Sequence, residues 1–168
     1  MRSILRFIVL AWLGTGVAHA AFNSFATVPE WGALAQELGG DKVRVYTATS
    51  PLQDPHHVQA KPSLIARART ADLVVATGAE LEVGWLPLVL QQAGNDKVQP
   101  GSPGYFEATS VVPMLGKPTR LDRAEGDVHP QGDPHIQGDP RNIAKVAAAL
   151  EQRLEQLDAS NAAYYKAR

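Results

Sequence analysis

The sequence has 168 residues, with 16 Lys and Arg against 17 Asp and Glu, so its formal net charge is −1 at pH 7. Basic residues do not cluster with aromatic ones, which argues against a nucleic-acid partner. The chain has no cysteine, which excludes disulfides, thiolate metal sites and a lipid-modified cysteine. The length is enough for one domain with its own core.

The first twenty residues are typical of a secretory signal peptide. Arg2 and Arg6 form a positive start, an apolar run covers 7–13, and Ala18-His19-Ala20 matches an A-x-A cleavage signal. We expect cleavage after Ala20 and a soluble exported protein in a Gram-negative periplasm; an uncleaved anchor is the alternative. Cleavage would remove two of the 16 basic residues, which leaves 14 against 17 acidic residues, a charge of −3.

Strands and helices are expected to alternate along the rest of the chain. The predicted strands cover 22–28, 43–47 and 72–77, and 97–99 fits a further short strand. The predicted helices cover 29–38, 63–70, 85–92 and 140–157, and another begins at 162. The segment 105–115 has no assignment. This alternation predicts an α/β fold with a mainly parallel sheet flanked by helices.

Asp54-Pro55-His56 and Asp133-Pro134-His135 repeat one tripeptide on two loops that each precede a helix. The prolines stiffen both loops, and loops at strand ends of open α/β sheets are where ligands bind. Neutral imidazole is a common zinc ligand, and two such side chains on separate loops can meet over one ion. The pattern therefore predicts a metal site formed by His56 and His135. The alternative interpretation of each is an ordinary surface histidine.

The residues beside these two histidines are interpreted as supporting or surface groups. His57 points away from His56 if the loop is extended, so it is expected to be a surface residue. Asp54 and Asp133 are expected to form turns or to orient the histidines rather than to bind metal themselves.

The segment 120–139 is polar, has very few apolar residues and is expected to be a surface loop rich in groups that bind metals. His129 within it fits either a surface residue or an auxiliary metal collector. Glu80 and Glu82 follow a predicted strand end and could face the same edge as His56. A charge pair at the start of a helix is the interpretation that we favour for them.

Taken together, these motifs resemble the zinc/manganese class of ABC-transporter substrate-binding proteins. The resemblance rests on the signal peptide, the two Asp-Pro-His loops, and the segments 26–31, 62–63, 71–75, 77–82 and 139–142. It implies that His56 and His135 are metal ligands and that the protein is not an enzyme. It further implies that the cargo is Zn²⁺, or alternatively Mn²⁺, and that the partner is the membrane permease of an ABC importer, with the binding protein a monomer.

The resemblance also implies the domain organisation. We expect a signal peptide over 1–20, an N-terminal α/β metal-binding lobe over 21–138, a long linking helix over 139–157, and the start of a truncated segment over 158–168. Family members are about twice as long and take a third histidine and a carboxylate from a second lobe, which we expect to be absent here. Part of the apolar stripe of the linking helix should then remain exposed.

Two other functions remain open. A stand-alone periplasmic metal chaperone or buffer would need only one lobe. A metallo-hydrolase would use open zinc positions to activate water, but the sequence has no H-E-x-x-H or G-x-S-x-G motif and no clear general base beside either histidine. The hydrolase is therefore the less favoured of the two.

Overall fold

The computed structural model describes residues 21–121, 124 and 126–168; the predicted signal peptide lies outside them. The strands are β1 (Phe22–Ala26), β2 (Val43–Thr47), β3 (Leu73–Ala76) and β4 (Tyr105–Glu107). The α-helices are α1 (Pro29–Gly39), α2 (Pro62–Arg69), α3 (Leu86–Ala93), α4 (Pro140–Leu157) and α5 (Ala162–Lys166). Short 3₁₀ turns are η1 (Asp96–Val98), η2 (Ala108–Val111), η4 (Ile136–Gly138) and η5 (Ala159–Asn161).

The four strands form one parallel sheet in the order β2-β1-β3-β4. Phe25 of β1 pairs with Tyr46 on one side and with Val74 on the other. Every residue of β3 is buried, as expected for an inner parallel strand that is covered on both faces. The predicted α/β fold is therefore confirmed. The strand order reverses between β1 and β3, and ligands bind beyond the carboxyl ends of the strands at such a point.

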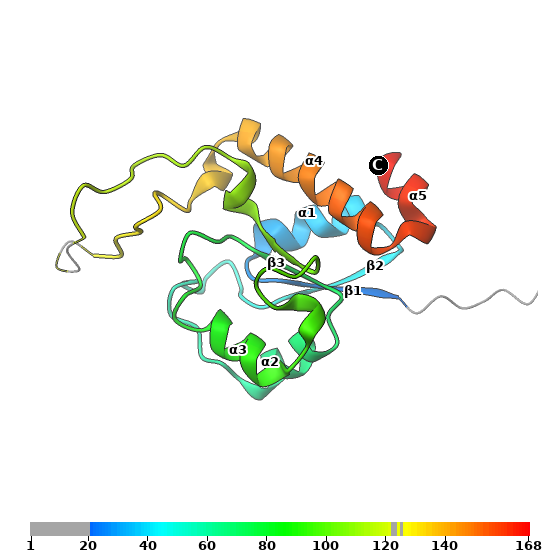
Figure 1. Ribbon diagram of the computed structural model, residues 1–168, viewed down its shortest axis with the longest axis horizontal. Coiled ribbons are helices and arrows are strands. Elements are labelled where there is room, and N and C mark those ends of the chain that lie inside the picture. Colours follow the sequence, from blue (N-terminus) through cyan, green and yellow to red (C-terminus); the bar gives the residue numbers. More distant parts are fainter. Residues whose placement is uncertain (1–20, 122–123, 125) are drawn as a thin grey trace, which may run out of the picture.

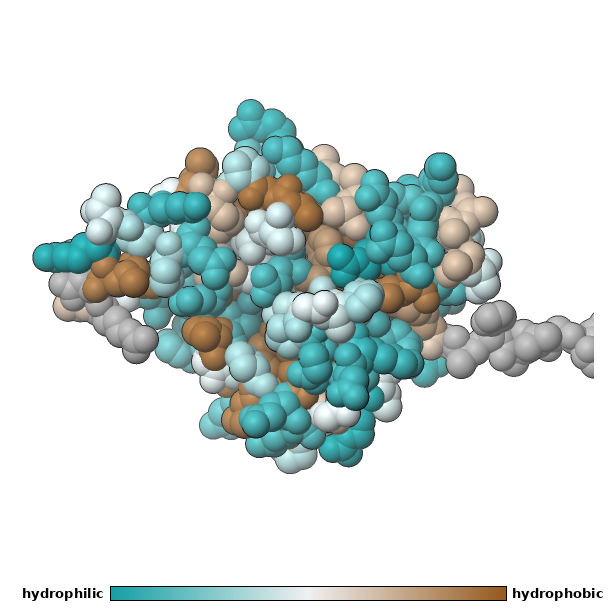
Figure 2. Space-filling view, viewed as in Figure 1, coloured by the Kyte–Doolittle hydropathy of each residue, from teal (hydrophilic) through white to brown (hydrophobic). Residues whose placement is uncertain are grey.

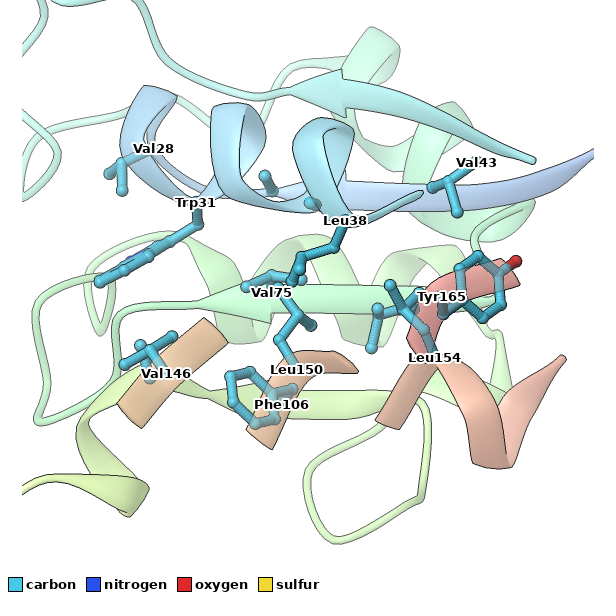
Figure 3. Packing of buried hydrophobic residues seen from close by; sticks show 14 of the residues in the cluster. Val28, Trp31, Leu38, Val43, Val75, Phe106, Val146, Leu150, Leu154 and Tyr165 are labelled. Atoms are coloured by element: carbon cyan, nitrogen blue, oxygen red, sulfur yellow. The ribbon is translucent and has the colours of Figure 1, made fainter. Parts of the chain in front are cut away.

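Helices cover both faces of the sheet (Figure 1). Trp31 of α1 and Leu150 of α4 pack with Val75 of β3 on one face (Figure 3). On the other face, helices α2 and α3 bury a second cluster that includes Leu64, Val89 and Val74. The sheet thus carries a core on each side, and the loops at its edge are attached to a well-packed base.

Helix α4 begins where the sequence predicts. The Asp139 carboxylate accepts a hydrogen bond from the backbone N–H of Arg141 at 2.8 Å, and Pro140 occupies the first turn. The guanidinium of Arg141 also binds this carboxylate and, together with the backbone bond, lowers the pKa of Asp139 to about 2. The helix start is therefore fixed by local chemistry.

Less of the α4 stripe is exposed than predicted, because its centre is buried and its flanks are partly buried. Val146, Leu150 and Leu154 are buried, and the flanking apolar residues Ile143, Ala147, Ala149 and Leu157 pack against the same cluster. Among the described residues, none of the exposed large hydrophobic side chains belongs to α4. The face of the sheet and α1 are wide enough to cover the stripe within this lobe. On the face seen in Figure 2, hydrophobic surface is divided into separate patches among hydrophilic areas.

The predicted strand at 97–99 is also wrong. Asp96–Val98 forms a 3₁₀ turn, because the Asn95 side chain accepts from the backbone N–H of Lys97 and starts a helical turn instead. The sheet position beside β3 is taken by Tyr105–Glu107, within the segment that had no assignment. The apolar residue of the short run, Val98, is nevertheless buried.

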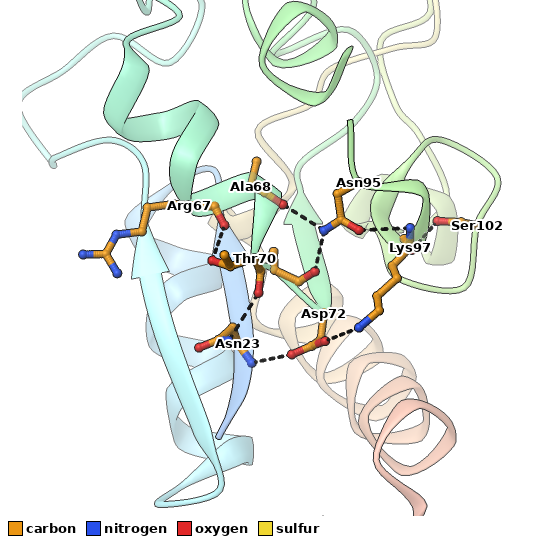
Figure 4. A network of polar contacts seen from close by, with 9 residues as sticks. Asn23, Arg67, Ala68, Thr70, Asp72, Asn95, Lys97 and Ser102 are labelled. Carbon is orange, nitrogen blue, oxygen red and sulfur yellow. Dashed lines mark hydrogen bonds and ion pairs between the residues drawn. The ribbon is translucent and has the colours of Figure 1, made fainter. Parts of the chain in front are cut away.

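A polar network closes the amino-terminal end of the sheet (Figure 4). The Asp72 carboxylate accepts from the backbone N–H of Asn23 and from the Lys97 ammonium, both at 3.0 Å. The Asn95 amide donates to the carbonyls of Ala68 and Ala71. This network ties β1 to the α2–β3 connection and lies at the end of the strands opposite to the predicted metal loops.

Candidate metal centre

The loop after β2 presents His56 in a fixed orientation. The indole N–H of Trp85 donates to the carbonyl of Pro55 at 2.8 Å. At Gly84, a Cβ atom would lie 3.1 Å from the carbonyl oxygen of His56, so a glycine allows the two loops to approach closely. Asp54 Oδ1 accepts from the backbone N–H of His56 at 2.9 Å and lies 2.8 Å from its ring Nδ1.

The loop before α4 repeats this local structure around His135. Asp133 Oδ1 accepts from the backbone N–H of His135 at 2.9 Å and lies 2.8 Å from its Nδ1. The backbone N–H of Asp133 donates to the carbonyl of Leu115 at 2.8 Å, which fixes the loop to the preceding segment. The repeated tripeptide thus gives one repeated turn, in which the aspartate orients the histidine as the sequence predicted.

These aspartates determine which ring nitrogen is available in each histidine. An ionised carboxylate only accepts, so the facing Nδ1 carries the proton and Nε2 presents a lone pair. The backbone N–H and ring of His56 lower the pKa of Asp54, and those of His135 lower the pKa of Asp133. Both carboxylates are therefore ionised at neutral pH, and both Nε2 atoms can bind a metal.

The structure brings the two predicted ligands together. The ring centroids of His56 and His135 are 6.0 Å apart, although the residues are 79 positions apart in the chain (135 less 56). The His56 side chain is 16% exposed and the His135 side chain 53% exposed. Two adjoining hollows of about 460 and 230 Å³ lie here, the first lined by His56 and the second by His135.

His129 is the residue that sequence reasoning left open. Its Nε2 lies 3.2 Å from Nε2 of His56, and its Nδ1 lies 3.1 Å from the carbonyl oxygen of Ala79. Its ring centroid is 5.3 Å from that of His56 and 6.4 Å from that of His135. The only sequence signal was its place in a polar loop, because a contact between residues 56 and 129 depends on the fold.

The two glutamates have different environments. Glu82 is 3% exposed and accepts from the Thr27 hydroxyl at 2.6 Å and from the backbone N–H groups of Thr77 and Gly78 at 2.8 and 3.2 Å. The favoured interpretation as a charge pair is therefore wrong for Glu82, which is a buried acceptor for backbone donors. Glu80 is exposed, and so is His57, as predicted.

The histidines are close but not yet in a coordinating arrangement. Within the described ranges, no three side chains of His, Asp or Glu are placed so that they could hold a metal ion as they stand. A larger hollow of about 610 Å³ lies at the opposite end of the sheet. Its charged residues are Asp72, Lys97 and Asp158. Asp72 and Lys97 pair with each other, and Asp158 accepts from the Asn161 amide and the Tyr165 hydroxyl, so the histidine loops are the better candidate for metal.

Comparison of the sequence with models of protein families shows to which family the chain belongs. The model of the family described as zinc-uptake complex component A, periplasmic (ZnuA), matches residues 25–168. The chain belongs to this family. The resemblance inferred from the motifs is thereby confirmed.

Two curated relatives of this ZnuA-family chain are streptococcal. The metal ABC transporter substrate-binding lipoprotein ScbA of Streptococcus cristatus is 21% identical over 118 residues, which are 68% of this chain and 37% of ScbA. The manganese ABC transporter substrate-binding lipoprotein PsaA of Streptococcus pneumoniae is 24% identical over 136 residues, which are 79% of this chain and 43% of PsaA. The ZnuA-family chain thus spans less than half the length of these relatives.

Solved structures share the fold. A crystal structure of ZnuA is 25% identical with a TM-score of 0.65, over 88% of this chain and 51% of that one. The manganese-bound periplasmic metal-binding protein of Candidatus Liberibacter asiaticus is 21% identical with a TM-score of 0.68, over 86% and 49%. In the described part of the ZnuA-family chain, no helix is both long enough and apolar enough to cross a membrane.

Proposed function

We propose that this protein is the periplasmic solute-binding component of a zinc ABC importer, which captures Zn²⁺ and delivers it to a membrane permease. His56 and His135 are the proposed ligands, and the protein binds its cargo without transforming it. The observation that carries the proposal is the matched pair of Asp-Pro-His turns, each of which leaves an Nε2 lone pair free at one edge of the sheet.

The ligand chemistry favours zinc over manganese. Imidazole nitrogen suits zinc, copper and nickel, whereas carboxylate, carbonyl and water suit manganese. Both proposed ligands are imidazoles whose second nitrogen is held by a carboxylate, an arrangement that raises the basicity of the coordinating nitrogen. Mn²⁺ remains the alternative cargo, since one curated relative is named as a manganese transporter protein.

Isothermal titration with Zn²⁺ tests the proposed ligands. We expect the wild-type protein to bind zinc and the His56→Ala/His135→Ala double variant to lose binding in the same range of concentration. His57→Ala is the matched control, because this neighbouring histidine is exposed and its ring lies 6.2 Å from that of His56. Equal binding by the wild type and the double variant would refute the assignment.

We further propose that the chain reaches the periplasm through cleavage after Ala20. The proposal rests on the positive start, the apolar run and the Ala18-His19-Ala20 signal, which lie outside the described residues. Mass spectrometry of the periplasmic fraction should find a protein that begins at Ala21. A full-length chain that retains Met1 in the membrane fraction would point to an anchor instead.

A further inference from the structure

We propose that His129 is a third metal ligand, supplied by the same lobe as His56 and His135. The three imidazoles would bind one late first-row divalent cation, with zinc the best fit. The inference rests on the proposed function and deepens it, because it gives this lobe three protein ligands where the sequence predicted two. It is carried by the contacts of both ring nitrogens of His129.

The first argument concerns two lone pairs. The carbonyl oxygen of Ala79 can only accept, so Nδ1 of His129 is the protonated nitrogen and Nε2 presents a lone pair. The Asp54 carboxylate has the same effect on His56. The two Nε2 atoms lie 3.2 Å apart. When both rings are neutral, two lone pairs at this distance repel each other unless a proton or a metal ion lies between them, and a divalent metal ion can accept both.

The second argument concerns distance. Zinc binds imidazole nitrogen at about 2.0–2.1 Å in tetrahedral geometry, so two coordinating nitrogens are about 3.3–3.4 Å apart. The 3.2 Å between the Nε2 atoms of His56 and His129 is close to one edge of that tetrahedron. These two side chains thus have the separation that zinc requires with almost no rearrangement.

The third argument concerns the backbone that orients His129. Ala79 and Glu80 have φ of 49° and 67°, a left-handed conformation that residues other than glycine rarely adopt. Buried Glu82 holds this turn by accepting from the N–H groups of Thr77 and Gly78. Such strain is retained where the surrounding structure enforces it, often at binding sites. Here the turn presents the Ala79 carbonyl to His129.

His135 must move to complete the set. Its ring centroid is 6.0 Å from that of His56 and 6.4 Å from that of His129, whereas the latter two are 5.3 Å apart. The side chain is 53% exposed, which leaves its ring room to turn. Three imidazoles leave the fourth position of a tetrahedral zinc open to water or to another ligand.

Nitrogen-15 NMR of the histidine rings tests this inference on the purified wild-type protein. A saturating amount of Zn²⁺ should shift the Nε2 signals of His56, His129 and His135 together, and leave the signals of His57 unchanged. Shifts confined to His56 and His135 would support the proposed function and overturn the role of His129. Absence of any shift would overturn both.

Zinc titration of single variants gives a second measure. His129→Ala should weaken binding at least about tenfold, the smallest effect expected from loss of a group that tunes a metal site. His57→Ala should bind as the wild type does. Thermal unfolding of the metal-free His129→Ala variant should match the wild type, which would show that the lost affinity does not come from misfolding. Unchanged zinc affinity in His129→Ala would contradict the proposal.

Discussion

At the scale of single residues, Glu82 shapes the metal centre through the backbone. Its carboxylate is buried and accepts three hydrogen bonds, from the Thr27 hydroxyl and from the N–H groups of Thr77 and Gly78. The carboxylate thereby joins the ends of β1 and β3 at the point where the strand order reverses. It also holds the turn whose Ala79 carbonyl faces His129.

Glu82→Gln should destabilise the protein by about 1–3 kcal/mol, because the amide group removes one acceptor oxygen and leaves a buried N–H without a partner. Urea unfolding at neutral pH measures this change in the free energy of unfolding. Glu80→Gln is the matched control, since Glu80 is exposed and its substitution should change stability by no more than about 0.5 kcal/mol. Equal stabilities of the two variants would refute the proposed role of the carboxylate.

The same scale shows what the sequence could predict about the site. Each Asp-Pro-His turn is local, because Asp54 and His56 are two residues apart, so the orientation of the ring follows from the tripeptide. The pairing of His129 with His56 spans 73 residues and depends on how two loops fold over one sheet edge. Periodicity and spacing carry no information about such a contact.

At the scale of elements, local signals predicted α4 and failed for β4. Asp139, Pro140 and a regular apolar stripe define the helix from its own residues. The strand Tyr105–Glu107 has only three residues and exists because β3 offers it an edge. A run this short is too brief to show a strand pattern of its own. The other candidate for a short strand, 97–99, forms part of a 3₁₀ turn instead, because the Asn95 side chain caps that turn.

The covered stripe of α4 follows from the width of the base beneath it. Leu150 and Leu154 reach α1 and the sheet in one cluster with Trp31 and Phe106. A helical period in the sequence shows that one face is apolar but does not show what packs on it. The predicted exposure of α4 therefore depended on which elements pack against it, and these elements, α1 and the sheet, belong to the same lobe.

At the scale of the whole molecule, the proposed ligands lie at one edge of the sheet, in a lobe that has a core on each side of that sheet. Neither core includes a histidine, so we expect the fold to form without metal. The three histidines nevertheless come from two loops that the sheet edge brings together, His56 from one and His129 and His135 from the other. Metal binding should add a modest stabilisation to a structure that is already packed, because it joins these loops without creating a new core.

We expect zinc to raise the unfolding temperature of residues 21–168 by only a few degrees. At a free zinc concentration about ten times Kd, RT ln(1 + [L]/Kd) is about 1.4 kcal/mol, which corresponds to roughly 3–6 °C for a chain of this size. Thermal unfolding with micromolar zinc and then with excess chelator measures the shift and its reversal. The His56→Ala/His135→Ala variant is the control and should show no shift.

A chain extended by the second lobe of a family member should show a larger shift, because further ligands would raise the affinity. If residues 21–168 alone gave a shift as large as the extended chain, the one-lobe site would be complete. That result would favour a stand-alone metal chaperone over an importer component.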